Sequence, residues 1–389
     1  MIFAEPAFMI LFALTVLAFF VSPRRWRPAV LIVSGLGFYG VYAPAFLPFV
    51  VLLIAATHLA RGSAAIWINV AALAGLMGYF KLRAQAAAEA VQSLAIGDAM
   101  NRLALPLGAS FLIFELIHYA VERRRGRLAR AGLAGLAAFA LYFPCRIAGP
   151  IKRYGPFEQS IREASWSAAQ CYRGSVRILW GLLKKLVVAD VLALMVAPLN
   201  YWTNPAHLWM VLVVYSLYIY ADFSAYSDIA IGLSWILGLA VPENFRAPYF
   251  SPNIREFWNR WHISLSSWLG DYLFLPISAR LARAGTITPR WAAVIGYLAT
   301  FALCGLWHGP AWHFLLWGVY HGALLSLYSL CRTSGLSIPW PRASAAWRGI
   351  GRGLAVAGTF LAVTFGWALF AVNSPTACKL ALRLLGLRA

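Results

Sequence analysis

Long apolar stretches recur along most of this chain, and they are continuous rather than alternating. The segments ILFALTVLAFFV (10–21) and HLWMVLVVYSLYIY (207–220) lack the residue-by-residue alternation of a membrane β-strand, so they predict helices. Apolar blocks lie near 7–22, 28–43, 45–60, 64–80, 103–121, 131–148, 174–198, 206–221, 225–240, 291–306, 311–331 and 352–372. A helix needs roughly 20 residues to cross a bilayer. We therefore expect an all-α, polytopic integral membrane protein with about ten or eleven spans, the other blocks being interfacial or re-entrant.

The composition supports the same class. Of the 389 residues, 61% are hydrophobic and only 12% are charged, and the mean hydropathy is +0.70. Soluble domains are roughly 45–50% apolar and about 25% charged, so a soluble enzyme, a disordered protein and a secreted disulfide scaffold are excluded. The five cysteines form no CxxC pair, which favours neither a disulfide framework nor a zinc site. The simplest division is one membrane-embedded domain over 1–389.

Basic residues greatly outnumber acidic ones, 33 to 13, for a formal charge of +20. Loops that face the cytoplasm collect Lys and Arg, and such residues follow the first apolar block at Arg24, Arg25 and Arg27 and a later block at 123–130. This pattern predicts a first helix with its N-terminus outside, and the charges come after the apolar stretch, unlike those of a cleaved signal. Nucleic acid is not an expected partner, because no aromatic–basic module is present.

The segment 241–290 interrupts the apolar rhythm by mixing charges, prolines and dense aromatic residues. Trp258, Trp261 and Trp268 recur at a spacing that suits a short amphipathic helix at the level of the lipid headgroups. Polar segments inside a membrane protein line a cavity or lie at an interface. We therefore expect 241–290 to be an amphipathic or re-entrant segment with a functional role.

Few ionisable residues lie within the apolar blocks. They include Glu115, His118, Lys184, Lys185, Asp190, Asp222 and Asp228, apart from the histidines discussed next. Such groups are costly in a bilayer, so each is either a structural ion pair or part of a functional site. The sequence leaves both readings open.

Three of the seven histidines fall within 308–321, and His262 lies in the amphipathic segment. An imidazole can accept and return a proton near neutral pH. Gly309 and Pro310 follow His308 and predict a helix break there, which makes His308 a candidate proton carrier, with a buried core histidine as the alternative. A metal site is disfavoured by the absence of a zincin-like His-Glu-x-x-His pattern, and a Cys304–His308 thiolate pair stays a weaker option.

Four motifs together resemble one family. They are YIYADFSAYSDIAIG (218–232), PENF (242–245), FWNRWHISLSSWLGDYLFLPI (257–277) and GLWHGPAWHFLLWGVYHG (305–322), with weaker matches at 78–81, 105–114, 143–154 and 181–190. In this order they resemble the membrane-bound O-acyltransferase family, and within it the bacterial branch of alginate O-acetylases and the D-alanyl transfer protein of teichoic acid synthesis.

The resemblance implies a fold and an activity. The fold would be a bowl of tilted helices with a central tunnel in the bacterial cytoplasmic (inner) membrane. A thioester donor, acetyl-CoA or an acyl carrier protein, would load from the cytoplasm, and the acyl group, acetyl by family default, would pass to a hydroxyl on the outer side. The acceptor would be an exopolysaccharide or cell-wall polymer, with an extracytoplasmic partner protein. No cofactor and no metal ion are expected.

The resemblance also implies the site residues. The two family histidines correspond to His262 and His308, with His308 expected as the base and His262 expected to orient or polarise the donor. Substrate- or donor-binding roles are expected for Asn259, Arg260, Trp261, Ser264, Trp268, Asp271, Tyr272, Trp307, Gly309 and His321.

The chain departs from the family pattern at two places. The usual Phe-Pro-Gln-Leu is FPCR at 143–146, and the late Phe-Arg-Ala is FAV at 370–372. Two other functions remain as alternatives: a transporter or flippase, for which Asp222, Asp228 and Lys185 would speak, and a non-catalytic scaffold of a polysaccharide export complex. No inverted repeat of broken helices supports the transporter, and a scaffold has no need for His262 and His308.

Overall fold

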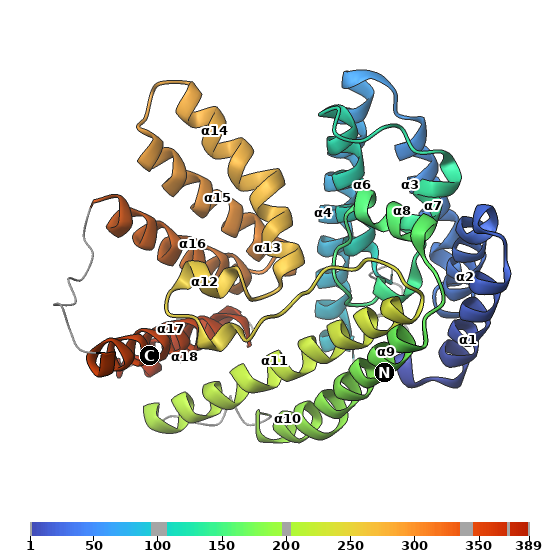
Figure 1. The fold of residues 1–389 in the computed structure, drawn as a ribbon. Helices are drawn as coiled ribbons and strands as arrows, with labels where there is room; N and C mark the ends of the chain where they lie inside the picture. The colour runs from blue at the N-terminus through green and yellow to red at the C-terminus, as the bar shows by residue number, and fades with distance from the viewer. Residues whose placement is uncertain (1, 95–106, 197–203, 335–344, 372–373, 388–389) are drawn as a thin grey trace. The chain divides into compact units, whose positions relative to one another are not determined.

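The structure is a computed structural model that describes residues 2–94, 107–196, 204–334, 345–371 and 374–387 (Figure 1). All regular elements in these residues are helices, which confirms the all-α prediction. The chain forms two compact units. Unit 1 comprises Met1–Lys185 and Phe223–Glu243, and unit 2 comprises Leu186–Asp222 and Asn244–Ala389. The prediction of a single domain stays a prediction.

Unit 1 is a set of apolar helices around an aromatic core. Its helices are α1 (Pro6–Val21), α2 (Arg27–Tyr42), α3 (Leu47–Leu59), α4 (Gly62–Leu94), α6 (Ala109–Arg124), α7 (Leu133–Ala140), α8 (Tyr154–Glu163) and α9 (Ala168–Leu183). Phe8, Phe38 and Phe143 pack together, with ring centroids 5.6 Å apart for Phe38 and Phe143 and 5.4 Å apart for Phe8 and Phe143. Buried aromatic rings in such contacts stabilise the packing of these helices.

Unit 2 contains the short helices of the amphipathic segment and a long hairpin formed by α15 and α16. Its helices are α10 (Asp190–Val196), α12 (Ile254–Trp258), α13 (Ile263–Leu269), the π-helix η7 (Gly270–Phe274), α14 (Leu275–Arg283), α15 (Pro289–His308), α16 (Trp312–Thr333), α17 (Ala345–Phe370) and α18 (Ser374–Leu384). A Cβ atom at Gly305 would lie 2.1 Å from the Phe314 carbonyl oxygen, and one at Gly318 would lie 2.1 Å from that of Phe301. Only glycine lets α15 and α16 approach so closely.

Five helices are long and apolar enough to cross a membrane. They are Gly62–Ala86, Pro205–Ile236, Pro289–His308, Trp312–Thr333 and Gly349–Phe370. Three shorter apolar helices, Pro6–Val21, Pro44–Leu59 and Leu133–Cys145, are also found among the described residues. The polytopic class is thus confirmed, whereas the predicted total of ten or eleven spans stays a prediction.

The apolar blocks 206–221 and 225–240 are not separate helices. One helix, α11 (Pro205–Ile236), runs through both blocks and contributes to both units. The intervening residues contain no proline or glycine, and acidic residues alone do not end a helix. Likewise α4 extends to Leu94, well beyond the end of the apolar block 64–80.

Charged residues within unit 1 form two buried or half-buried clusters. Glu115 contacts Arg146 at 3.1 Å and also the ammonium group of Lys152, and all three side chains are at most 2% exposed. In the second cluster Arg177 binds Asp228 at 3.0 Å and both carboxylate oxygens of Glu243 at 2.5 Å, while Lys184 lies 2.6 Å from Asp228. For Glu115, Asp228 and Lys184 the structure therefore favours a structural ion pair over a functional site, and Asp228 was one of the residues that would have supported a transporter.

Candidate active site

His308 lies at the end of α15, where the chain breaks. The helix ends at His308, Gly309 is extended, and α16 begins at Trp312, as Gly309 and Pro310 predicted. The half-buried His308 ring is surrounded by aromatic rings: its centroid lies 4.5 Å from Trp307, 5.1 Å from Trp317 and 4.9 Å from Phe370. The helix break thus places the imidazole of His308 among apolar aromatic side chains.

His262 occupies a strained position just before α13. Its backbone has φ 43° and ψ 53°, the left-handed region that non-glycine residues seldom adopt. Such a conformation costs about 1–3 kcal/mol and concentrates at functional sites. The side chain is 3% exposed, and its Nδ1 lies 3.0 Å from Oδ1 of the fully buried Asn244.

The surroundings of His262 keep it uncharged. Burial lowers the pKa of His262 to about 3, so the imidazole is neutral at physiological pH. The Asn244 Oδ1 atom also receives the Ser264 hydroxyl at 2.8 Å and the Ser264 backbone N–H at 3.3 Å. Ser264 therefore supports the Asn244–His262 contact, and its predicted donor-binding role stays a prediction.

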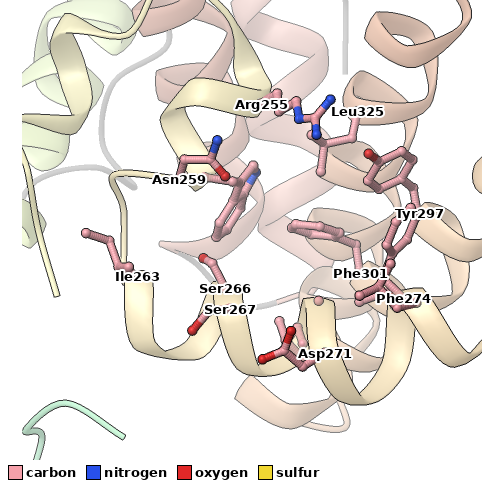
Figure 2. A pocket seen from close by; sticks show the side chains of 15 residues that line it. Arg255, Asn259, Ile263, Ser266, Ser267, Asp271, Phe274, Tyr297, Phe301 and Leu325 are labelled. Carbon is pink, nitrogen blue, oxygen red and sulfur yellow. The ribbon is translucent and has the colours of Figure 1, made fainter. Parts of the chain in front are cut away.

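A cleft of about 570 Å³ opens beside α12 and α13 (Figure 2). Its wall is aromatic on the side of Trp258, Phe274, Tyr297 and Phe301, and polar groups gather at Arg255, Asn259, Ser266, Ser267 and Asp271. Figure 2 shows Asn259 and Ser266 on one side of this space and Tyr297 and Phe301 on the other. The predicted residues Asn259 and Asp271 thus line one cleft.

A second cleft, of about 880 Å³, shares Arg255 and Asn259 with the first. Arg246, Arg255 and Arg260 face it with a single acidic residue, Glu256, which is paired with Arg260. Arg246 and Arg255 form no ion pair within the part of the chain that the structure describes. A basic cleft next to an aromatic one suits a ligand with an anionic group on an apolar arm.

The remaining predicted residues lie apart from these clefts. Trp268 and Tyr272 pack against each other at 5.1 Å, and Trp261 packs against Trp367 at 5.3 Å. His262, His308 and His321 line neither cleft. The structure thus places Asn259, Arg260 and Asp271 at the clefts, and the other predicted site residues are not among the residues that line them.

His321 lies between two indole rings, one from the wall of the first cleft and one that contacts His308. It is completely buried, and neither ring nitrogen has a hydrogen-bond partner among the described residues. Its ring lies 5.2 Å from Trp258, a wall of the cleft, and 5.0 Å from Trp317, which in turn contacts His308. An unpaired buried imidazole is costly, so its position beside the site points to function.

Sequence reasoning missed several residues of this site. Asn244 was only part of the PENF motif, and its distance of 18 residues from His262 gives no hint of their contact. Trp258 was noted only for its spacing in the amphipathic segment, and Trp317 and Arg255 were not singled out. Trp317 precedes His321 by four residues, which places both on one helix face and was the available signal.

Comparison with known proteins gives the same identification as the motifs. The family model for the membrane-bound O-acyltransferases matches residues 119–335. A protein named a probable alginate O-acetylase, from Azotobacter vinelandii, is 32% identical over 95% of this chain and 75% of its own length. The teichoic acid D-alanyltransferase of Bacillus subtilis is 35% identical over 68% of each chain.

A third relative widens the range of acceptors named in this group. The peptidoglycan O-acetyltransferase of Helicobacter pylori is 32% identical over 49% of this chain and 36% of its own length. The family model covers more than half of the chain, and the Azotobacter relative is matched over three quarters of its length. The chain therefore belongs to the membrane-bound O-acyltransferase family and is a multi-pass membrane acyltransferase.

Proposed function

We propose that this protein moves an acyl group, acetyl by preference, from a cytoplasmic thioester donor to a hydroxyl group of an exopolysaccharide or cell-wall polymer on the outer side of the bacterial cytoplasmic membrane. The relatives' names supply the class of acceptor, because they refer to alginate, teichoic acid and peptidoglycan. The observation that carries the proposal is the pair His262 and His308, held by buried and aromatic surroundings in one compact unit.

The reaction needs a proton acceptor and no other reactive group. The hydroxyl oxygen forms a bond to the acyl carbon, the carbon–sulfur bond breaks, and the hydroxyl proton ends on the departing thiolate. A neutral imidazole can carry that proton, which contributes about 10²–10⁴-fold to a rate. Apolar walls keep water from hydrolysing the thioester. Neither a metal ion nor a cofactor takes part in this scheme.

The donor would occupy the two joined clefts. Acyl-CoA and the prosthetic arm of an acyl carrier protein both carry phosphate groups on a long arm, and Arg246 and Arg255 are cations that form no ion pair among the described residues. The arm would then lie along Trp258 and Phe301 of the adjoining cleft. An extracytoplasmic partner protein would complete transfer to the polymer.

The test measures ester-linked acyl groups of the envelope and of secreted polysaccharide, released by mild alkali and identified by mass spectrometry. A deletion strain would carry wild type, His308→Ala, His262→Ala or, as the matched control, His207→Ala, which replaces an exposed histidine at the start of α11. With membrane levels equal, we expect the ester to fall at least 100-fold for the first two variants and to persist for the control.

The same experiment separates the alternatives. If both histidine variants restored the ester lost in the deletion strain, the protein would act as a scaffold or conduit and the catalytic assignment would be wrong. If deletion changed no ester, acyl transfer to these polymers would be contradicted and lipid or solute transport would have to be measured.

A further inference from the structure

Helices α1 and α2 of unit 1 pack side by side and enclose an apolar groove between them (Figure 1). The groove has a volume of about 560 Å³ and extends from Leu11 and Gly37 at one end to Ser22 and Trp26 at the turn that joins the two helices. A Cβ atom at Gly37 would lie 3.6 Å from a δ-carbon of Leu11, so the helices are close together at the end away from the turn. The groove thus follows the α1–α2 pair along most of its length.

The groove offers no free polar group along its course. The two buried residues that line it are Thr15 and Ser34, and their hydroxyls donate to main-chain carbonyls of their own helices at 2.6 Å and 3.1 Å. A hydroxyl bonded in this way turns its polar atom toward the helix. Leu14 and Val33, both exposed, form the aliphatic rims. This lining suits a hydrocarbon chain.

The dimensions of the groove select one kind of hydrocarbon. From Leu11 to Ser22 a helix rises about 16 Å, and half of the hydrocarbon core of a bilayer is about 15 Å thick. The groove therefore has the length of one lipid acyl chain in one leaflet. Spread over that length, 560 Å³ gives a cross-section of roughly 35 Å², less than half that of a helix about 10 Å wide. An acyl chain fits this space better than a helix of a partner protein.

The end of the groove at the turn is basic. Arg24 and Arg25 are exposed there, and neither forms an ion pair within the ranges that the structure describes. The sequence contains no Asp or Glu anywhere in 6–88. Trp26, which lines the groove beside them, is 57% exposed, and tryptophan is typical of the headgroup level of a membrane. Two cations are thus available at the level where lipid phosphates lie.

A third arginine holds the turn in place. Arg27 is buried, its guanidinium lies 5.0 Å from the centre of the Phe19 ring, and its Nη1 donates to the Ala164 carbonyl at 2.5 Å. Stacking and the hydrogen bond to a distant loop keep this residue for structure. The two exposed arginines therefore extend from a turn of fixed position.

We propose that the groove between α1 and α2 binds one anionic phospholipid, with an acyl chain along the groove and the phosphate group at Arg24 and Arg25. Basic residues at a membrane surface attract anionic headgroups, and a zwitterionic headgroup gains less because it carries its own cation. The site is separate from the proposed acyl transfer, and the bound lipid would stabilise the packing of α1 on α2.

Native mass spectrometry of the purified full-length chain in detergent counts bound lipids and measures their affinity. The probes are phosphatidylglycerol, which is anionic, and phosphatidylcholine, which is zwitterionic. We expect one phosphatidylglycerol to bind about tenfold more tightly than phosphatidylcholine. Arg24→Gln/Arg25→Gln should weaken phosphatidylglycerol binding about 25-fold, because each arginine near the surface contributes about fivefold. Arg280→Gln/Arg290→Gln, which changes two exposed arginines of unit 2, is the matched control and should leave binding unchanged.

A second pair of variants tests the groove itself. Ala18 lines the groove and is exposed, so Ala18→Phe fills the groove without disturbing the core. We expect this change to weaken phosphatidylglycerol binding about tenfold, which corresponds to about two displaced methylene groups. The matched control is Leu17→Phe, at a neighbouring residue that is 62% exposed and does not line the groove. Unfolding temperatures without added lipid would show that both variants are folded.

Every outcome either supports or overturns the proposal. Equal affinities for the two lipids, or unchanged phosphatidylglycerol binding in Arg24→Gln/Arg25→Gln, would overturn the headgroup site. Unchanged binding in Ala18→Phe would overturn the acyl-chain site. Glycerol phosphate, which has no acyl chain, should not displace the lipid; if it did so at equal concentration, the turn would bind free phosphate and the lipid assignment would fail. A protein that copurifies with wild type but not with Ala18→Phe would assign the groove to a partner helix instead.

Discussion

Two regions of this protein, the charged clusters of unit 1 and the surroundings of His321 in unit 2, satisfy their polar groups differently. In unit 1, buried carboxylates face cations: Glu115 binds Arg146 and Lys152, and Asp228 binds Arg177 and Lys184. In unit 2, His321 is completely buried with neither ring nitrogen bonded among the described residues, and the Trp258 indole nitrogen and the Thr300 hydroxyl are in the same state. Paired charges fix helices, whereas incomplete hydrogen bonding indicates where a ligand or a reaction completes it.

The largest expected effect comes from breaking the Glu115 cluster. Glu115→Gln leaves Arg146 and Lys152 buried without their shared anion, and losing one partner of a buried ion pair costs about 3–5 kcal/mol. Thermal unfolding in detergent would show this loss. The variant that remains folded should transfer acyl groups at the wild-type rate, and a rate that fell with unchanged stability would contradict the structural role.

A smaller loss is expected at the half-buried cluster. Arg177→Met removes the hydrogen bonds to Asp228 and Glu243, and each hydrogen bond to a charged group is worth about 1.5–3 kcal/mol. Solvent screening and the remaining Lys184–Asp228 pair reduce the total to about 2 kcal/mol. Unfolding midpoints measured in the same detergent would rank this variant between wild type and Glu115→Gln; a variant as stable as wild type would show that the cluster is not structural.

Substitution of His321 in unit 2 should raise the stability of the protein, whereas the substitutions in unit 1 lower it. His321→Phe replaces an imidazole whose nitrogens lack partners by an apolar ring, which removes a desolvation penalty of about 1–3 kcal/mol. We expect a higher unfolding temperature and, because Trp258 and Trp317 lose their polar neighbour, slower acyl transfer. Ser326→Ala on the same helix, whose hydroxyl is bonded to Gly322 at 2.8 Å, is the control with no expected gain. A destabilised His321→Phe would refute this comparison.

The smallest effect is expected at the surface. Glu158→Gln removes an exposed i,i+4 pair with Arg162 on α8, and such pairs are worth about 0.3–0.5 kcal/mol. The change in unfolding temperature should therefore be close to the error of the measurement. A loss comparable to that of Arg177→Met would show that exposed charges of unit 1 matter as much as buried ones.

Much of the architecture could be predicted because it depends on local composition. Apolar runs specify helices, and Gly309 and Pro310 specify the break after His308. The continuity of α11 could not be read from hydropathy, because Asp222 and Asp228 lower the local apolar average without ending a helix. Hydropathy averages the polarity of neighbouring residues along the sequence. A helix depends instead on backbone hydrogen bonds, which acidic side chains leave intact.

The sequence named candidate reactive groups of the site, which stay predictions, and missed the residues that support them. His262 and His308 stand out as titratable residues in unusual settings, and the family motifs place both. Asn244 and the partners of Glu115 depend on contacts between residues 18, 31 and 37 positions apart, which no periodicity encodes. Tertiary packing brings these side chains together, so only coordinates reveal them.

The glycine contacts between α15 and α16 have an evolutionary consequence. With Gly305 and Gly318 letting the two backbones touch, the hairpin is a rigid module that carries His308 at its break and His321 on its second arm. A module stiffened by its own main chain keeps its geometry when surfaces elsewhere diverge. The relatives' names refer to three different polymers, and such diversification is possible when changes that alter the choice of acceptor leave the hairpin untouched.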